Sequence, residues 1–138
     1  MAIALKSQTI TKGFIIAGLM NLSVLVFSRF FTNSVIPESD PNVMSNFGLL
    51  IIVVWGLAYI SVAKNYQHVK WLVGVFAIEK IIYGIIWIKW MLSNNVSNIF
   101  SKDKMAGIFY SIYGINDLLF FIFFSLVFLR LIKIEAKK

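Results

Sequence analysis

Residues 71–92 read WLVGVFAIEKIIYGIIWIKWML, an almost unbroken apolar run with a Glu-Lys pair inside it. A helix needs about 20 predominantly apolar residues to cross the hydrocarbon core of a bilayer, and this run is long enough. Residues 14–31, 47–63 and 107–132 are three further apolar stretches. Because a backbone inside a bilayer must satisfy its own hydrogen bonds, we expect each stretch to be a membrane-spanning helix.

The composition of the whole chain agrees with this interpretation. Of the 138 residues, 59% are hydrophobic and 14% are charged, whereas typical soluble domains have about 45–50% and about 25%. A soluble domain of this size leaves about a third of its unfolded surface exposed, so it cannot bury so many apolar side chains. The sequence therefore predicts one all-α integral membrane domain, a bundle of four transmembrane helices over residues 1–138. It excludes a disordered chain, a disulfide scaffold and an ordinary soluble enzyme.

The basic residues predict the orientation of the chain. Cytoplasmic loops of membrane proteins carry an excess of Lys and Arg, so we expect both termini and the loop at residues 64–70 in the cytoplasm. The chain would then be a multi-pass protein of the bacterial inner (plasma) membrane. The residues expected on the cytoplasmic side are Lys6, Lys12, Lys64, Lys70, Arg130, Lys133, Lys137 and Lys138. Those expected on the other side are Arg29, Lys102 and Lys104, offset by Glu38, Asp40 and Asp103.

The net charge of +7 has the same explanation. A nucleic-acid-binding protein needs a clustered basic surface with a fold of its own, and no segment here is long enough to form one. We therefore expect the lipid bilayer as the partner, with a homo-oligomer or a larger membrane complex as a further possibility, and no nucleic acid.

Two short segments join the spans on the outer side. Residues 32–46 contain Pro37 and several Asn and Ser residues, which favour turns. In the second segment, residues 93–106, we expect a short interfacial helix at residues 96–100. Trp71 and Trp90 are expected to anchor the third span at the two membrane interfaces.

The informative residues inside the spans are polar, because ionisable groups in a bilayer cost several kcal/mol and seldom face lipid. Glu79 and Lys80 are in the third span and Asp117 is in the fourth, while Asn21 and Trp55 are in the first and second. At 1.5 Å per residue, all five lie about 10–16 Å above the cytoplasmic boundary. Each predicted helix thus places a hydrogen-bonding group in one slab near the midplane.

The helical period places these groups on faces rich in aromatic residues. At 100° per residue, Tyr83 shares a face of the third span with the Glu-Lys pair, while the opposite face is aliphatic and suits lipid. The aliphatic face consists of Val75, Ile78, Ile82 and Ile85. We expect the four polar faces to turn inward around a common centre. The candidate ligand- or ion-binding residues are Asn21, Trp55, Glu79, Lys80, Tyr83 and Asp117.

The charged residues in the spans have two interpretations, and the sequence leaves both open. In the first, Lys80 forms a structural ion pair that locks the third span to the fourth. In the second, the charges form a binding site, because one cation cannot compensate the carboxylates of both Glu79 and Asp117. The centre is then negative unless one carboxyl group holds a proton or binds a ligand.

The sequence contains no recognisable catalytic, metal-binding or cofactor-binding motif. It has one His, no Cys, no Glu-x-x-His spacing and no phosphate-binding glycine loop, so we expect no cofactor, no metal and no catalytic residues. The first functional hypothesis is binding or transport of a proton, an ion or a small amphipathic molecule at the midplane site.

Two alternatives to this hypothesis remain. One is an accessory or structural subunit of a larger membrane complex. A stripe of small residues in the fourth span, Gly107, Ser111 and Gly114, permits close helix packing within the chain or between protomers. The other is an isomerase-like membrane enzyme that acts on a hydrophobic substrate with two carboxyl groups inside an aromatic cage.

Several short motifs resemble a known group of proteins. They are the runs FGLL at residues 47–50 and WGLAY at residues 55–59, Glu79-Lys80-x-x-Tyr83, and Tyr113-Gly114-x-x-Asp117-Leu118-x-Phe120. Together, over residues 47–125, they resemble small four-helix bacterial membrane proteins, which include the BphX-like proteins. The resemblance implies the four-helix topology and directs attention to the three charged residues of the spans. It implies no reaction, because the group has no established biochemical activity.

Overall fold

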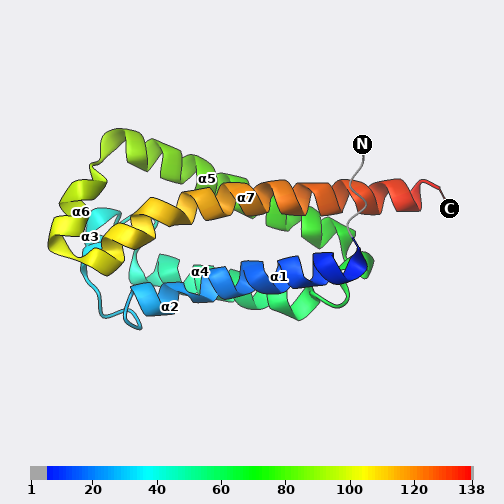
Figure 1. Ribbon diagram of the computed structural model, residues 1–138, viewed down its shortest axis with the longest axis horizontal. Helices are drawn as coiled ribbons and strands as arrows, with labels where there is room; N and C mark the ends of the chain where they lie inside the picture. Colours follow the sequence, from blue (N-terminus) through cyan, green and yellow to red (C-terminus); the bar gives the residue numbers. More distant parts are fainter. Residues whose placement is uncertain (1–5, 138) are drawn as a thin grey trace.

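The computed structural model describes residues 6–137, and within that range the chain forms helices and turns with no β-strand. The long helices are α1 (Ser7–Leu22), α4 (Asn46–Val62), α5 (Lys70–Ser93) and α7 (Lys104–Glu135). The short ones are α2 (Val24–Phe27), α3 (Val35–Ser39), α6 (Val96–Lys102) and the 3-10 helix η1 (Tyr66–His68). The long helices run in alternating directions, so the two ends of the chain lie at the same end of the molecule (Figure 1).

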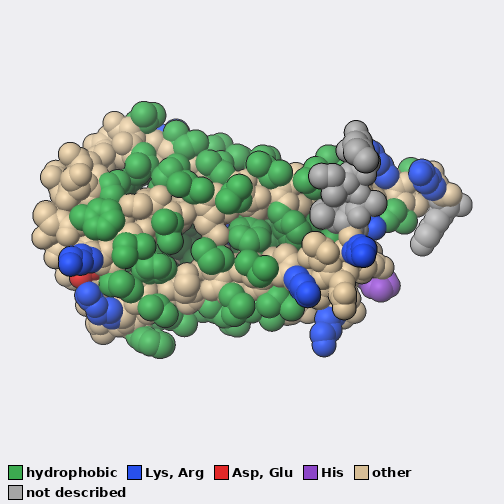
Figure 2. All heavy atoms as spheres, viewed as in Figure 1, with side chains coloured by type: hydrophobic (Ala, Val, Ile, Leu, Met, Phe, Trp, Pro, Cys, Tyr) green, Lys and Arg blue, Asp and Glu red, His purple; other side chains and the backbone are tan. Residues whose placement is uncertain are grey.

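Three helical segments are long and apolar enough to cross a membrane: Ser7–Phe27, Lys70–Ser93 and Lys104–Glu135. The remaining long helix, α4, is also apolar but has only 17 residues. Hydrophobic side chains cover the middle of the visible face in Figure 2, and the Lys and Arg side chains gather at its two ends. An apolar surface of this extent is typical of a membrane protein.

The observed helices match three of the four predicted stretches closely. Those expected at residues 47–63 and 71–92 are α4 and α5, with bounds that differ by one residue at each end. The one expected at residues 107–132 is α7, which is three residues longer at both ends. Its early start is explained by Asp103, whose carboxylate accepts a hydrogen bond from the Ala106 backbone N–H at 2.8 Å. Such a cap satisfies a free N–H group of the first turn.

The first predicted span, residues 14–31, differs from the observed helix at both ends. The helix begins at Ser7, is interrupted at Ser23 and ends at Phe27. Arg29, Phe30 and Phe31 then have φ angles of 48°, 53° and 67°, a left-handed conformation that ends a right-handed helix and that residues with a Cβ seldom adopt.

Polar side chains hold this left-handed turn in place. The Ser28 hydroxyl accepts a hydrogen bond from the Phe31 backbone N–H at 3.1 Å. The Asn33 side-chain amide donates to the Phe27 carbonyl at 3.2 Å. These contacts satisfy backbone groups that the end of a helix leaves free, which the apolar pattern of the sequence does not reveal.

The long helices form two pairs, α1 with α4 and α5 with α7. The first pair is close because Gly18 and Gly56 face each other: a Cβ on Gly56 would lie 2.8 Å from the Gly18 carbonyl oxygen. The small-residue stripe of α7 packs inside the chain, since Gly114 faces the Trp87 ring of α5 and Gly107 faces the Phe100 ring of α6.

Aromatic side chains fill the space between the two pairs. On the side of the chain ends, Phe14 from α1 lies 5.1 Å from Phe124 of α7 between ring centroids, and Tyr59 from α4 lies 4.8 Å from Phe76 of α5. Each ring comes from a different long helix. The core of the molecule is therefore shared by all four long helices.

The opposite end of the molecule differs from the prediction in two respects. Residues 35–39 form the short helix α3 where only turns were expected. Trp90 is not an interfacial anchor: it is 8% exposed, its ring stacks on Tyr110 at 4.2 Å, and its indole N–H donates to the Ser39 carbonyl at 3.0 Å. The helix expected at residues 96–100 is present as α6.

Candidate functional site

Three of the long helices converge on the ammonium group of Lys80. Its Nζ lies 2.6 Å from Asp117 Oδ1 of α7, 2.8 Å from Asn21 Oδ1 of α1 and 4.0 Å from Glu79 Oε2 beside it on α5. Lys80 is only 1% exposed, and the other three residues are also buried. The structure thus brings together four of the six predicted site residues. We call Asn21, Glu79, Lys80 and Asp117 the polar cluster.

The groups around Lys80 accept hydrogen bonds from its ammonium group or face it with an aromatic ring. The side-chain amide of Asn21 donates to the Ile52 carbonyl of α4 at 3.0 Å, and this bond turns the amide oxygen of Asn21 toward Lys80. The ring of Tyr59 lies 5.1 Å from the Lys80 Nζ, a distance at which a ring face attracts a cation. Lys80 therefore has two direct oxygen acceptors and an aromatic neighbour.

Glu79 is in a different situation from Asp117. Asp117 binds the ammonium group directly, while the Glu79 carboxylate is 4.0 Å from it, beyond hydrogen-bond distance. The hydrogen bond that Glu79 does receive comes from the neutral hydroxyl of Tyr59. The Lys80 ammonium group is therefore near two carboxyl groups but hydrogen-bonds only that of Asp117.

Tyr59 also belongs to the candidate site, because it contacts Glu79, but it is not among the site residues predicted from the sequence. By residue count its Cα lies about 6 Å closer to the cytoplasmic boundary than that of Trp55. Side chains on a helix lean toward its N-terminus, and the N-terminus of α4 is at the far end. The long Tyr59 side chain therefore reaches toward the middle and contacts Glu79.

Trp55 and Tyr83 lie beside the polar cluster, where they line a groove on the apolar surface. The groove has a volume of about 290 Å³ and runs between α4 and α5. Ile78 and Ile82 form part of its wall and are 58% and 50% exposed. Glu79, which is 7% exposed, supplies the acidic residue of this otherwise largely hydrophobic lining.

A small cavity lies on the other side of Glu79, within the bundle. It has a volume of about 40 Å³ and is lined by the whole polar cluster and by Tyr113. Because one water molecule needs about 10–15 Å³, there is room for about three. The Tyr113 hydroxyl is buried and has no hydrogen-bond partner within residues 6–137. Glu79 and Tyr83 line both the groove and the cavity.

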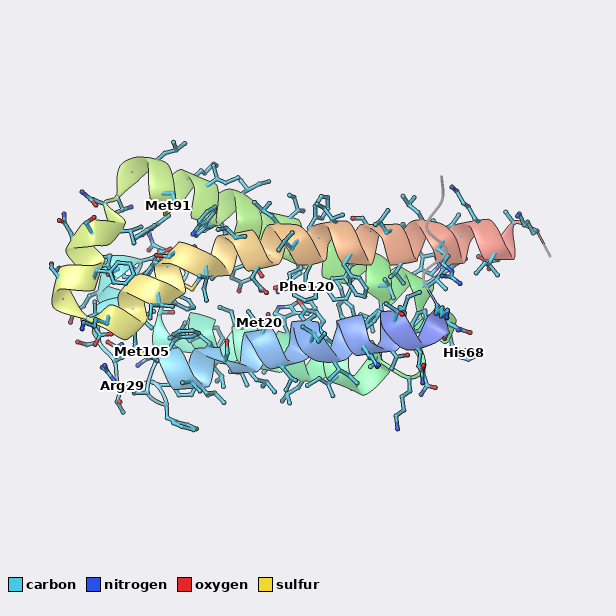
Figure 3. The ribbon with its side chains drawn as sticks, viewed as in Figure 1. Met20, Arg29, His68, Met91, Met105 and Phe120 are labelled. Carbon is cyan, nitrogen blue, oxygen red and sulfur yellow. The ribbon has the colours of Figure 1, made fainter. Side chains whose placement is uncertain are left out.

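The labelled residues of Figure 3 help to locate these features. Met20 on α1, which lines the cavity, and Phe120 on α7 mark the middle of the molecule. His68 is at the end that holds both chain termini, and Arg29 and Met105 are at the other. The described part of the chain, residues 6–137, contains no group of three His, Asp or Glu side chains that could hold a metal ion.

No protein-family model, curated protein or solved structure matches this chain. The resemblance to BphX-like proteins stays a prediction from short motifs, and the function must be argued from the geometry of the polar cluster and the spaces beside it.

Proposed function

We propose that the protein spans the bacterial inner membrane four times, with both termini in the cytoplasm, and binds or transports a cation at Glu79. The cation is a proton, a small inorganic ion or the charged group of a small amphipathic molecule. The observation that carries this proposal is that the Lys80 ammonium group hydrogen-bonds Asp117 at 2.6 Å but lies 4.0 Å from Glu79, so that, within residues 6–137, Glu79 has no cation at hydrogen-bond distance.

The argument is one of charge balance in an apolar region. An uncompensated ionised group costs several kcal/mol there, even after the surroundings relax. With both carboxyl groups ionised, the polar cluster carries one excess negative charge. The hydrogen bond from Tyr59 stabilises Glu79 but does not neutralise it. Glu79 therefore acquires a positive partner, either a proton or another cation.

The two spaces beside Glu79 give this partner different routes. The cavity of about 40 Å³ suits water, a proton or a small ion, but it is too small for an organic molecule. The groove of about 290 Å³ suits the cationic group of an amphipathic molecule that arrives along the apolar surface. A site open to one space on each side is the arrangement that uptake and release require.

The proposed topology depends on α4. Its 17 residues extend about 25 Å at 1.5 Å per residue, and a bilayer accommodates such a slightly short helix by small local thinning at modest cost. The chain ends lie together in the structure, as four crossings require (Figure 1).

Infrared spectroscopy of the protein in lipid nanodiscs tests whether Glu79 holds a proton. A protonated carboxyl group in an apolar site has its own C=O stretching band. We expect this band in the unaltered protein, with loss in Glu79→Gln and retention in Glu38→Gln, which changes an exposed glutamate outside the polar cluster.

Reconstituted vesicles test cation binding and movement. Two activities are measured: the proton flux reported by an internal pH dye, and the binding of tetraphenylphosphonium, a lipophilic cation. We expect Glu79→Gln to lose each activity that the parent protein has, and Glu38→Gln to keep it. If the infrared band, the flux and the binding are all the same in Glu79→Gln as in the parent, the proposal is wrong and the polar cluster is a structural ion pair.

The two alternative functions receive less support. The small residues that suggested an accessory subunit are in contact with Trp87 and Phe100 of the same chain. An isomerase-like enzyme needs an enclosed pocket with two available carboxyl groups. The groove is open and contains Glu79 alone of the two spanning acids, and the cavity that both acids line has a volume of only about 40 Å³. Cation binding requires neither feature.

A further inference from the structure

A further cavity in the described part of the chain is remote from the polar cluster. It has a volume of about 600 Å³ and lies at the end that carries the chain termini, between η1, the start of α5 and the end of α7. Its polar side includes Lys70, Arg130 and Glu135, and its apolar side includes Trp71 and Ile134. The cavity is therefore amphipathic.

The apolar side of this cavity continues the apolar surface of the helices, and its polar side lies beyond the end of that surface. Trp71 is 69% exposed, and its ring centroid lies 5.8 Å from that of Phe128, so the two rings continue the apolar surface of α5 and α7. The cations lie where that apolar surface ends. Tryptophan at such a boundary is typical of the level of the lipid headgroups.

The basic side chains on the polar side favour an anionic ligand, but the Glu135 carboxylate competes with such a ligand for Lys70. Lys70 forms an ion pair with Glu135 and lies 5.0 Å from the Trp71 ring centroid. The lining holds two basic side chains, Lys70 and Arg130, and one carboxylate, Glu135. The Glu135 side chain is 62% exposed, so it can turn into solvent and leave Lys70 to a phosphate group.

We propose that this cavity binds an anionic phospholipid. The headgroup phosphate contacts Lys70 and Arg130, and an acyl chain lies along Trp71 and Phe128. A zwitterionic lipid of the same shape gains less, because its own positive group lies close to the same cations. This site uses none of the residues proposed to bind a cation, so either proposal can fail without the other.

Native mass spectrometry of the detergent-solubilised protein tests the proposal with two lipids of identical acyl chains. We expect phosphatidylglycerol to bind more tightly than phosphatidylcholine. Because a basic residue near a lipid surface contributes about 1 kcal/mol, Lys70→Gln and Arg130→Gln should each weaken phosphatidylglycerol binding about fivefold. The matched control is Lys133→Gln, which removes an exposed cation of the same helix that does not line the cavity, and it should change little.

Glu135→Gln separates a binding site from a structural ion pair. If Glu135 competes with the phosphate for Lys70, its removal should strengthen phosphatidylglycerol binding severalfold, although it breaks the same ion pair as Lys70→Gln. If Glu135→Gln weakens binding as Lys70→Gln does, the ion pair supports the fold and the proposal is overturned. Size-exclusion elution at the parent volume confirms that each variant is folded before it is compared.

Two further measurements show whether the ligand of this cavity is a phospholipid. Glycerol phosphate has the anionic group without acyl chains, and we expect it to compete only at far higher concentration than the lipid. Equal competition would indicate a site for free phosphate esters and overturn the lipid proposal. Equal loss of binding in Lys133→Gln and Arg130→Gln would show that the whole basic end attracts anions, and that outcome overturns it too.

Discussion

At the scale of single residues, Lys80 determines whether the polar cluster is stable. It is almost fully buried and touches oxygen atoms from α1 and α7 while its own helix supplies Glu79. A buried ion pair by itself adds little net stability, because taking both charges out of water costs about as much as their attraction returns. Removal of one partner is costly, since it leaves the other charge uncompensated.

Lys80→Met should therefore destabilise the protein by about 3–5 kcal/mol, because it leaves the buried carboxylate of Asp117 without its cation. Reversible unfolding in mixed detergent micelles measures the change. Lys89→Met is the matched control on the exposed side of the same helix, and it should cost far less. Lys80→Met combined with Asp117→Leu should recover most of the loss. Failure to recover would show that Lys80 packing, and not charge, is what matters.

Tyr59→Phe should destabilise the protein by about 1–2 kcal/mol, because it removes the hydrogen bond to Glu79 and keeps the ring. The control is Tyr83→Phe, which deletes a hydroxyl group with no hydrogen-bond partner within residues 6–137 and should be nearly neutral. The same unfolding measurement applies to both variants. A cost in Tyr83→Phe equal to that in Tyr59→Phe would contradict this assignment.

The sequence predicts the members of the polar cluster better than their contacts. Helical period and residue count place Asn21, Glu79, Lys80 and Asp117 on inward faces at one depth, and the structure brings them together. They do not predict which carboxyl group Lys80 binds, because that depends on how α7 is rotated against α5. They also miss Tyr59, since the count locates its Cα and not the end of a long, tilted side chain.

At the scale of helices, Asp103 joins the start of α7 to the turn after α2. Its carboxylate accepts hydrogen bonds from the Ala106 backbone N–H and the Asn33 amide, both at 2.8 Å, and pairs with Arg29 at 2.7 Å. The hydrogen bond from Ala106, together with those from Arg29 and Asn33, holds the pKa of Asp103 below its ordinary value despite partial burial. One side chain thus caps a helix and fixes the loop beside it.

This lowered pKa predicts an acid-dependent loss of stability. The folded state favours ionised Asp103, so its contribution is complete above the ordinary aspartate pKa of about 4 and is lost as the pH falls through the lower folded value. Thermal unfolding in detergent from pH 7 to pH 3 should therefore show a smaller decline in Asp103→Asn than in the parent. Asp103→Ala also loses the cap and should cost about 1 kcal/mol at pH 7. An identical decline in parent and Asp103→Asn would refute this role.

The close approach of α1 and α4 predicts a difference between two glycines. In Gly56→Ala the new methyl group would lie 2.8 Å from the Gly18 carbonyl oxygen, so the helices must separate, at a cost of about 1–3 kcal/mol. In Gly74→Ala the nearest atom is 3.1 Å away and belongs to the Phe128 side chain, which can move. The higher helix propensity of alanine over glycine then offsets the cost of this crowding, so Gly74→Ala should change the free energy of unfolding little. Unfolding free energies of the two variants in the same detergent compare these costs.

Helix bounds are predicted well where apolar residues give way to charged ones and poorly elsewhere. The bounds of α5 follow from the apolar run between Lys70 and Ser93. The end of the first helix does not, because Phe30 and Phe31 are as apolar as the residues before them. Its position depends on backbone hydrogen bonds to Ser28 and from Asn33, a local geometry that hydropathy does not contain.

At the scale of the whole molecule, the structure consists of two antiparallel helix pairs around a shared aromatic core. The all-helical fold and its membrane character follow from the apolar stretches alone. The arrangement of the pairs does not, because four apolar helices can pack in several orders. Which order forms depends on close contacts such as Gly18 with Gly56 and Gly114 with Trp87.

The four-crossing topology can be tested with single cysteines, because the sequence contains none. Lys12→Cys, Gln67→Cys and Asn98→Cys introduce exposed thiols in α1, η1 and α6. With four crossings, a membrane-impermeant maleimide should label Asn98→Cys in spheroplasts and the other two only in inside-out vesicles. If α4 does not cross, Lys12→Cys and Gln67→Cys will react from opposite sides.

The distribution of charge over the two helix pairs has a consequence for membrane insertion during synthesis. Neighbouring Glu79 and Lys80 make the centre of α5 electrically neutral before α7 joins it. Asp117 arrives later in the chain, on α7, and takes the Lys80 ammonium group at 2.6 Å. The excess negative charge therefore enters the bilayer with α7, which follows α1, α4 and α5 in the chain, and the state that contains α7 is the first that has to neutralise it.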